Sequence, residues 1–137
     1  MLHEDIKKLT KENPNFRQVV YTGDWSQLVL MCIAPGEEIG EEVHHGVDQI
    51  LFLVEGEGQA ILEGETTPFK KHDVVFVPAG TKHNFVNTGD EDLKLYTVYS
   101  PPEHAYGTVH RTKADAEKAE EEHKRVEVTA HDIFDNL

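Results

Sequence analysis

Basic side chains, cysteine and long apolar runs are all scarce in this chain of 137 residues. It has 13 lysine and arginine residues against 26 acidic residues, which gives a formal net charge of -13. This excess of negative charge repels phosphate backbones and anionic lipid head groups, so we expect neither a nucleic acid nor a membrane as a partner. The single cysteine, Cys32, cannot form an internal disulfide, which is typical of a reducing compartment.

Apolar targeting segments are also missing from the sequence. No apolar stretch approaches the roughly 20 residues that a membrane helix needs. Residues 1–11 carry charges throughout and lack the apolar core of a secretory signal. The expected location is therefore cytoplasmic.

The middle of the chain has the texture of a β protein. Its length predicts one domain over 1–137, with a barrel core at about 17–100 and a C-terminal extension at 101–137. Short runs of β-branched and aromatic residues alternate with turns rich in Gly, Pro, Asn and Asp, and such spacing predicts an all-β antiparallel sandwich or barrel. The runs are 27–34, 48–55, 59–63, 74–77, 84–87 and 93–99.

Helical patterns occur only at the two ends of the sequence. Ile6 and Leu9 lie at helical spacing within 4–11, and Pro14 ends the pattern, so a short N-terminal helix is expected. Residues 113–125 consist of alanines and charged residues without a clear apolar stripe. This composition predicts a charged C-terminal helix that is solvated or faces a partner.

Nine histidines in so short a chain raise the question of a metal, since imidazole is the commonest transition-metal ligand. Glu42 and His44 are two residues apart, so in an extended strand their side chains leave the same face. In the next run only one of Asp48 and Gln49 can face inward, and alternation leaves open which one. His83 follows a Pro-Ala-Gly turn, from which it would approach on a neighbouring strand.

Two spaced motifs resemble those of the cupin family. A pattern of Pro, x, Gly, two residues, His, three residues and Asn is complete in Pro78, Gly80, His83 and Asn87. The other motif begins at Gly36 and ends at Gly56. Combined matches at the right separation are specific. In cupins the metal positions of these motifs correspond to four residues here: Glu42, His44, Gln49 and His83.

The resemblance implies a cupin-type double-stranded β-helix (jelly-roll) barrel of the single-domain, conserved-barrel kind. It selects Gln49 over Asp48 as the inward residue. The ligand set is similar to that of mannose-6-phosphate isomerase-like cupins, with the Glu and Gln positions exchanged. Cupins commonly pair through exposed strands, so the resemblance also implies a homodimer.

The implied ligand set contains two imidazoles and one carboxylate, which suits one divalent transition metal: iron, manganese, zinc, nickel or cobalt. Such an ion would act as a Lewis acid on a small-molecule substrate. The expected protein is a metalloenzyme, either an isomerase of the sugar-phosphate type or a dioxygenase or lyase. The alternatives are a non-catalytic barrel for metabolite binding or dimerisation, and a barrel without metal.

Three residues after the last predicted strand are candidates for catalysis. His104, Tyr106 and His110 follow the Pro101-Pro102 pair, and we consider them as acid–base or substrate-contact groups folded over the barrel mouth. The competing interpretation is an ordinary surface loop. His45 adjoins His44 but must point to the opposite face of a regular strand, so we expect it to be exposed.

Overall fold

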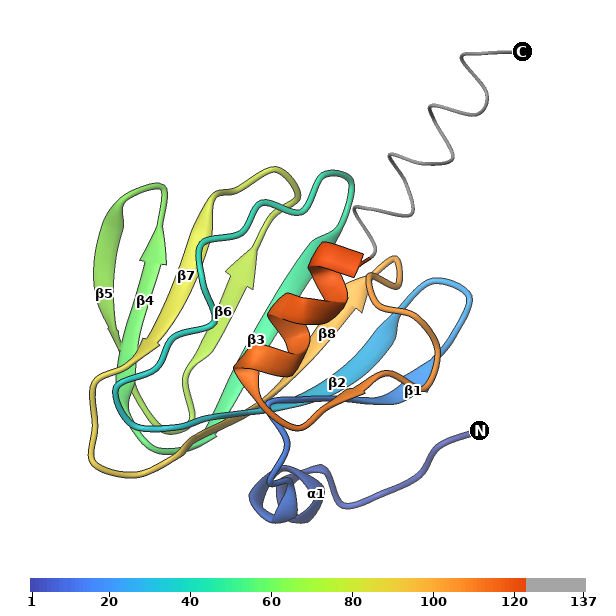
Figure 1. The fold of residues 1–137 in the computed structure, drawn as a ribbon, viewed down its shortest axis with the longest axis horizontal. Helices are drawn as coiled ribbons and strands as arrows, with labels where there is room; N and C mark the ends of the chain where they lie inside the picture. The colour runs from blue at the N-terminus through green and yellow to red at the C-terminus, as the bar shows by residue number, and fades with distance from the viewer. Residues whose placement is uncertain (123–137) are drawn as a thin grey trace.

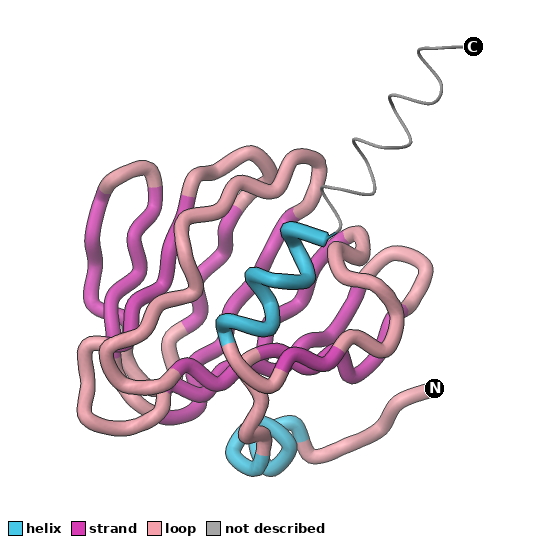
Figure 2. The backbone as a smooth tube through the Cα atoms, viewed as in Figure 1, coloured by secondary structure: helices cyan, strands magenta, loops and turns pink. Residues whose placement is uncertain are grey.

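The computed structural model describes residues 1–122, so residues 123–125 of the predicted C-terminal helix and the rest of the extension lie outside the described residues. Two sheets make up most of the described chain (Figures 1 and 2). The N-terminal helix and the strands are α1 (Ile6–Glu12), β1 (Arg17–Thr22), β2 (Gln27–Ile33), β3 (Asp48–Glu55), β4 (Gly58–Leu62), β5 (Glu65–Phe69), β6 (Val74–Val77), β7 (His83–Asn87), β8 (Leu93–Ser100) and β9 (Val109–His110).

The larger sheet has six strands in the order β6-β3-β8-β2-β1-β9, and the smaller has three in the order β5-β4-β7. Neighbouring strands within these two sheets pair antiparallel. One core fills the space between the two sheets, because buried side chains of both belong to the same cluster, such as Met31, Leu51, Ala60, Phe69 and Phe85. The predicted all-β architecture is confirmed.

Six of the strands lie within one or two residues of the runs predicted from sequence, and three strands were missed. β5 contains Pro68, which lowers its strand propensity and is tolerated because β5 is an edge strand. β9 has two residues and pairs with β1, so only the tertiary fold defines it. β1 was missed because the first predicted run begins at residue 27, after β1 has ended.

The predicted helices are present at both ends of the described chain. The Asp5 side chain accepts a hydrogen bond from the backbone N–H of Lys8 at 3.2 Å, which starts α1. α1 lies against β2, β3 and β8 on the outer side of the larger sheet. No helix within residues 1–122 is long and apolar enough to cross a membrane; the cytoplasmic location stays a prediction.

The C-terminal helix is not simply solvated, contrary to one of our expectations. It occupies residues 113–122 of the described chain and lies against the barrel (Figure 1). Ala116 is buried in the common core, and Ala119 lines a pocket at the barrel mouth. This contact was hard to predict, because alanine side chains are too small to give the helix a recognisable apolar face in the sequence. The other faces carry the charged residues.

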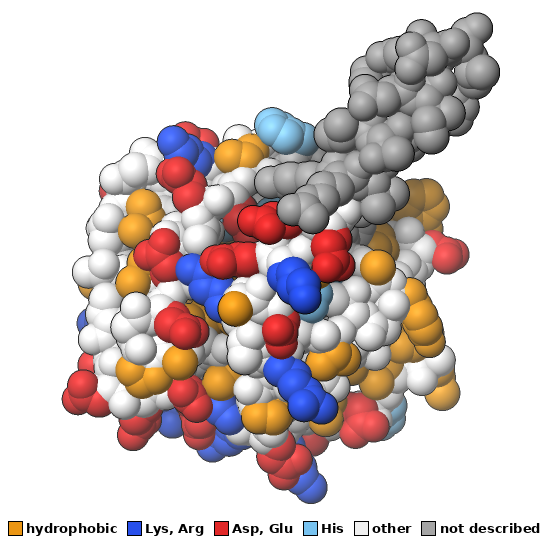
Figure 3. Space-filling model, in the orientation of Figure 1, with side chains coloured by type: hydrophobic (Ala, Val, Ile, Leu, Met, Phe, Trp, Pro, Cys, Tyr) orange, Lys and Arg blue, Asp and Glu red, His pale blue; other side chains and the backbone are white. Residues whose placement is uncertain are grey.

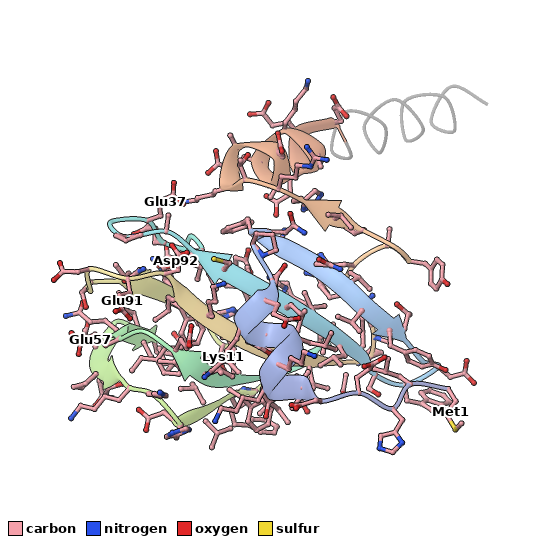
Figure 4. All side chains as sticks on the ribbon, turned by 90° about the horizontal axis from the view of Figure 1, so that it is seen from below. Met1, Lys11, Glu37, Glu57, Glu91 and Asp92 are labelled. Atoms are coloured by element: carbon pink, nitrogen blue, oxygen red, sulfur yellow. The ribbon has the colours of Figure 1, made fainter. Side chains whose placement is uncertain are left out.

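Negative charge is concentrated at the turns of one end of the barrel. Glu37, Glu57, Glu91 and Asp92 lie there together (Figure 4). Elsewhere acidic and basic side chains are mixed on the visible surface (Figure 3).

Candidate metal centre

Glu42 and His83 are held side by side by their own backbones. The segment between β2 and β3 runs along β7 and forms an isolated bridge at this pair. The N–H of Glu42 donates to the carbonyl of His83 at 2.9 Å, and the N–H of His83 donates to the carbonyl of Glu42 at 2.9 Å. Because directly opposed residues in an antiparallel pair project to one face, both side chains point the same way.

His83 presents one ring nitrogen with no protein partner. Its Nδ1 lies 2.8 Å from the carbonyl oxygen of Thr81 and donates to it. Its Nε2 is buried and makes no hydrogen bond with the described residues. A histidine whose Nδ1–H is held by a carbonyl has its Nε2 lone pair available for a metal. The side chain is only 3% exposed, so water does not readily satisfy that nitrogen.

His44 lies between two carboxylates. Its Nε2 is 2.9 Å from Oε2 of Glu42, and its Nδ1 is 3.3 Å from Oε1 of Glu103. Burial opposes protonation of the ring, but the hydrogen bonds and charges of Glu103 and Glu42 outweigh it and raise the pKa of His44 to about 9. A carboxylate on the second nitrogen of a metal-binding histidine is a common orienting contact.

Glu42 is ionised in this setting. Burial alone would raise the pKa of its carboxyl group, but the hydrogen bond and charge of His44, together with the charge of Arg17, lower it below the usual value. The carboxylate thus remains available as an anionic ligand near neutral pH.

Gln49 faces the barrel interior, as the resemblance implied. Its side chain is 2% exposed, whereas Asp48 is half-buried and accepts a hydrogen bond from the N–H of Ala79. The Gln49 amide nitrogen donates to the hydroxyls of Thr97 at 3.2 Å and Tyr99 at 3.1 Å. The Thr97 hydroxyl donates in turn to the carbonyl of Ile50, so it must accept from Gln49. Oε1 of Gln49 is therefore left buried and without a partner among the described residues.

These atoms fit a divalent transition metal. Glu42, His44 and His83 each offer one ligand atom, and the three atoms lie within 4.8 Å of one another. Donor atoms that bind one ion at about 2.1 Å and at right angles are about 3 Å apart, close to the 2.9 Å between His44 and Glu42. We call these three residues the metal centre. Gln49 as a fourth ligand stays a prediction.

A pocket of about 570 Å³ is lined by Glu42 and His44 of the metal centre. His104 and His110 line it, whereas Tyr106 does not and is 87% exposed. The surface-loop alternative therefore describes Tyr106, and the two histidines lie at the barrel mouth. His45 is exposed, as expected. The described lining residues are Arg17, Glu42, Val43, His44, Glu103, His104, Ala105, Thr108, His110, Ala119 and Glu120.

His104 is a neutral histidine packed on the barrel wall. Its ring lies edge-on to Tyr99 with centroids 5.0 Å apart, and its Nε2 is buried without a partner among the described residues. Burial and then the charge of Arg17 lower its pKa to about 3. The neutral imidazole offers one polar atom to whatever fills the pocket.

The buried side chain of Gln27 on β2 fixes the start of the extension. Its amide nitrogen donates to the carbonyl of His104 at 2.7 Å, and its oxygen accepts from the N–H groups of Glu103 at 3.2 Å and His104 at 3.0 Å. These bonds position Glu103 beside His44.

Sequence reasoning missed two residues of the site, Arg17 and Glu103. Arg17 lies on β1 and is 3% exposed, with its NH2 nitrogen 3.9 Å from Oε1 of Glu42. Alternation puts Arg17 on the same face as Val19, but the sequence does not show which face of that strand is inward. Glu103 has no distinguishing pattern, because its place depends on how the extension folds back.

Comparison with known proteins identifies the family. Residues 29–99 match the Cupin_2 cupin domain, so the chain belongs to the cupin family. The solved structure of BH2720 from Bacillus halodurans has 41% sequence identity and a TM-score of 0.84, covering 85% of this chain and 93% of that one. The predicted jelly-roll barrel with helices at both ends is confirmed. The mannose-6-phosphate isomerase-like subtype is not identified by these comparisons.

Curated relatives include proteins with and without an assigned activity. The uncharacterized protein YrkC of Bacillus subtilis is 44% identical over 124 residues, which cover 85% of this chain and 66% of that protein. A 5-nitrosalicylic acid 1,2-dioxygenase of Bradyrhizobium is 37% identical over 67 residues, 49% of this chain and 32% of the enzyme. Some relatives are thus enzymes, whereas the chain spans about two thirds of YrkC.

Proposed function

We propose that this cupin is a dioxygenase that uses one iron(II) ion at the metal centre to oxidise a small organic molecule. The observation that carries the proposal is the cluster of two imidazoles and one carboxylate with ligand atoms within 4.8 Å. Two histidines and one carboxylate on one side of an ion are typical of non-haem iron oxygenases, because they leave positions open for oxygen and substrate. Bound iron would supply the electrons that activate oxygen.

The surrounding residues would orient the ligands and shield the reaction. Glu103 holds the His44 ring, and the Thr81 carbonyl holds the His83 ring. The extension lines the pocket through Glu103, His104 and the helix at 113–122, so it would limit access of water to the substrate. The Bradyrhizobium dioxygenase supports this reaction class over part of the chain only.

A sugar-phosphate isomerase is less well supported. Phosphate recognition usually requires several basic side chains. Among the described residues that line the pocket, Arg17 is the only lysine or arginine. Three carboxylates, those of Glu42, Glu103 and Glu120, line the same space and would repel a phosphate dianion.

The proposal is tested by metal loading and oxygen uptake. The protein is reconstituted without oxygen, in turn with iron(II), manganese(II) and zinc(II), and its metal content is measured. Oxygen consumption is then followed with a panel of small diols, diketones and phenols. We expect one bound ion and substrate-dependent oxygen uptake with iron alone. The variant H83A should lose the metal, whereas H45A, at an exposed neighbouring position, should retain it.

Other outcomes assign the competing functions. Stoichiometric metal without turnover of any compound would favour a non-catalytic binding barrel. Zinc- or manganese-dependent turnover without oxygen would favour isomerase or lyase chemistry. Wild-type protein that binds none of the three metals would refute the metal centre itself.

We also propose that the protein is a homodimer joined through the outer face of the larger sheet. The strand register places four apolar side chains in one row across that face: Phe76, Ile50, Val98 and Leu28. Phe76 is 53% exposed and the other three are partly exposed. A contiguous apolar surface of this kind is typical of an interface. Two copies related by a two-fold axis would cover each other's row.

Sedimentation equilibrium tests the dimer. Ile50→Lys places a charge in the middle of the row and should yield folded monomers, since the side chain is already partly exposed. Because association stabilises the folded dimer, the variant should unfold at a lower temperature that no longer depends on protein concentration. Thr67→Lys on the other sheet is the matched control and should remain dimeric. A monomeric wild-type protein at micromolar concentration would refute this interface.

A further inference from the structure

Arg17 is a buried cation in the wall of the pocket. It begins β1 and pairs with Met31 of β2, whose side chain is fully buried. The arginine side chain is 3% exposed, although its guanidinium carries a full charge. Burial of a charged group is costly unless partners or a ligand compensate it. The groups that contact the Arg17 guanidinium therefore determine whether its charge is compensated.

The central carbon of the guanidinium lies 5.4 Å from the centroid of the Phe16 ring, and its hydrogen-bond partners among the described residues are few. Of its five N–H donors, one from NH1 reaches Nδ1 of His110 at a long 3.4 Å. Nε–H is buried and has no partner among the described residues. Among residues 1–122, the nearest carboxylate oxygen is on Glu42, 3.9 Å from NH2, too far for a hydrogen bond. Arg17 is thus prepared to donate hydrogen bonds to a group that residues 1–122 do not supply.

The charge of the pocket indicates what that group is. An ion at the metal centre would take up the charge of Glu42, which is also the nearest anion to Arg17. The guanidinium would then lack a counter-charge, and a ligand anion would provide one. A carboxylate matches the planar donor fork and carries one negative charge. A phosphate dianion is disfavoured by Glu103 and Glu120 in the same pocket.

We propose that Arg17 binds the carboxylate of a small organic acid, whose second oxygen function binds the ion at the metal centre. The assignment rests on the proposed function, because the second contact needs the ion. His104, which lies on the extension and also lines the pocket, has an unpartnered Nε2 that offers the same ligand a further polar contact. The volume of about 570 Å³ admits acids from a few atoms up to a single aromatic ring.

Calorimetric titration of the metal-loaded protein tests the assignment. The probes are glycolate, pyruvate, oxalate and salicylate, their methyl esters, and inorganic phosphate. Wild-type protein should bind at least one acid more tightly than its ester and than phosphate. Arg17→Gln should weaken that binding by about 10- to 100-fold, since hydrogen bonds to charged groups are lost. Arg111→Gln, at an exposed position, is the matched control and should bind as the wild type does.

Metal content is measured on the same samples, which separates the two proposals. Wild-type protein that takes up no metal would refute the proposed function, whether or not it binds the acids. Metal-loaded Arg17→Gln that binds the acid as tightly as the wild type would overturn the role of Arg17 alone. The role of Arg17 would also be overturned if the metal-loaded wild type preferred phosphate to every acid, or if it bound none of the acids. If Arg17→Gln does not fold, Arg17→Lys keeps the charge but loses the fork, and it should still weaken binding about 10-fold.

Discussion

The contact of His44 with two carboxylates predicts how strongly protons compete with metal. With a pKa of about 9, the metal-free ring is protonated near pH 7, and a metal must displace that proton. Two pH units below the pKa, the protonated form exceeds the neutral one about 100-fold, which corresponds to about 2.7 kcal/mol of binding free energy. Metal affinity should therefore rise about tenfold per pH unit and level off near the pKa. Glu42, whose pKa is lowered, remains ionised across this interval.

The measurement is the partition of zinc(II) between the protein and a fluorescent chelator of known pH dependence, from about pH 6 to about pH 9. Glu103→Gln removes one of the two carboxylates, so the pKa of His44 should fall and the affinity should level off at a lower pH. Glu57→Gln removes the same charge at a distant acidic turn and is the matched control. Zinc affinity that does not change with pH would refute this account of the His44 environment. A dependence of affinity on pH that is the same in Glu103→Gln as in the wild type would also refute it.

Three further substitutions test the fold and the ligand set. Phe85→Ala empties a fully buried position against Phe69 and should lower the free energy of unfolding in urea by about 3–5 kcal/mol. Gly58→Ala would drive a Cβ into the carbonyl oxygen of Val86 on β7 and should cost at least about 2 kcal/mol in the same assay; unchanged stability would contradict the close strand approach. Gln49→Leu should keep the fold, by thermal unfolding, and weaken metal retention about 10-fold; wild-type retention would remove Gln49 from the ligand set.

The sequence was most informative where local pattern and site coincide. His83 could be placed because its motif fixes a turn, a strand and a ligand together. Glu42 and His44 could be placed on one face by their spacing, and the structure brings their ligand atoms near His83. Asp48 and Gln49 showed the limit of the pattern, because both faces of that strand are rich in apolar residues, and only the family resemblance selected Gln49.

The rest of the site depends on tertiary packing that leaves little trace in the sequence. Arg17 becomes buried through the register of β1 on β2 and through the extension above it. Glu103 and His104 reach the pocket because Gln27 binds their backbone. Tyr106, which was a candidate for catalysis together with His104, does not line the pocket. Residue type alone therefore did not separate His104 and His110, which line the pocket, from Tyr106.

Gln27 makes three hydrogen bonds to main-chain atoms of Glu103 and His104, which tie the segment after β8 to the barrel, and its fourth partner is the Thr22 hydroxyl at 3.0 Å. Backbone anchoring of this kind does not depend on which side chains the anchored residues carry. Related barrels could therefore exchange the side chain of residue 104 while keeping the same path of the chain over the mouth. Divergence in substrate preference would then begin in this short stretch, with the ion's ligands untouched.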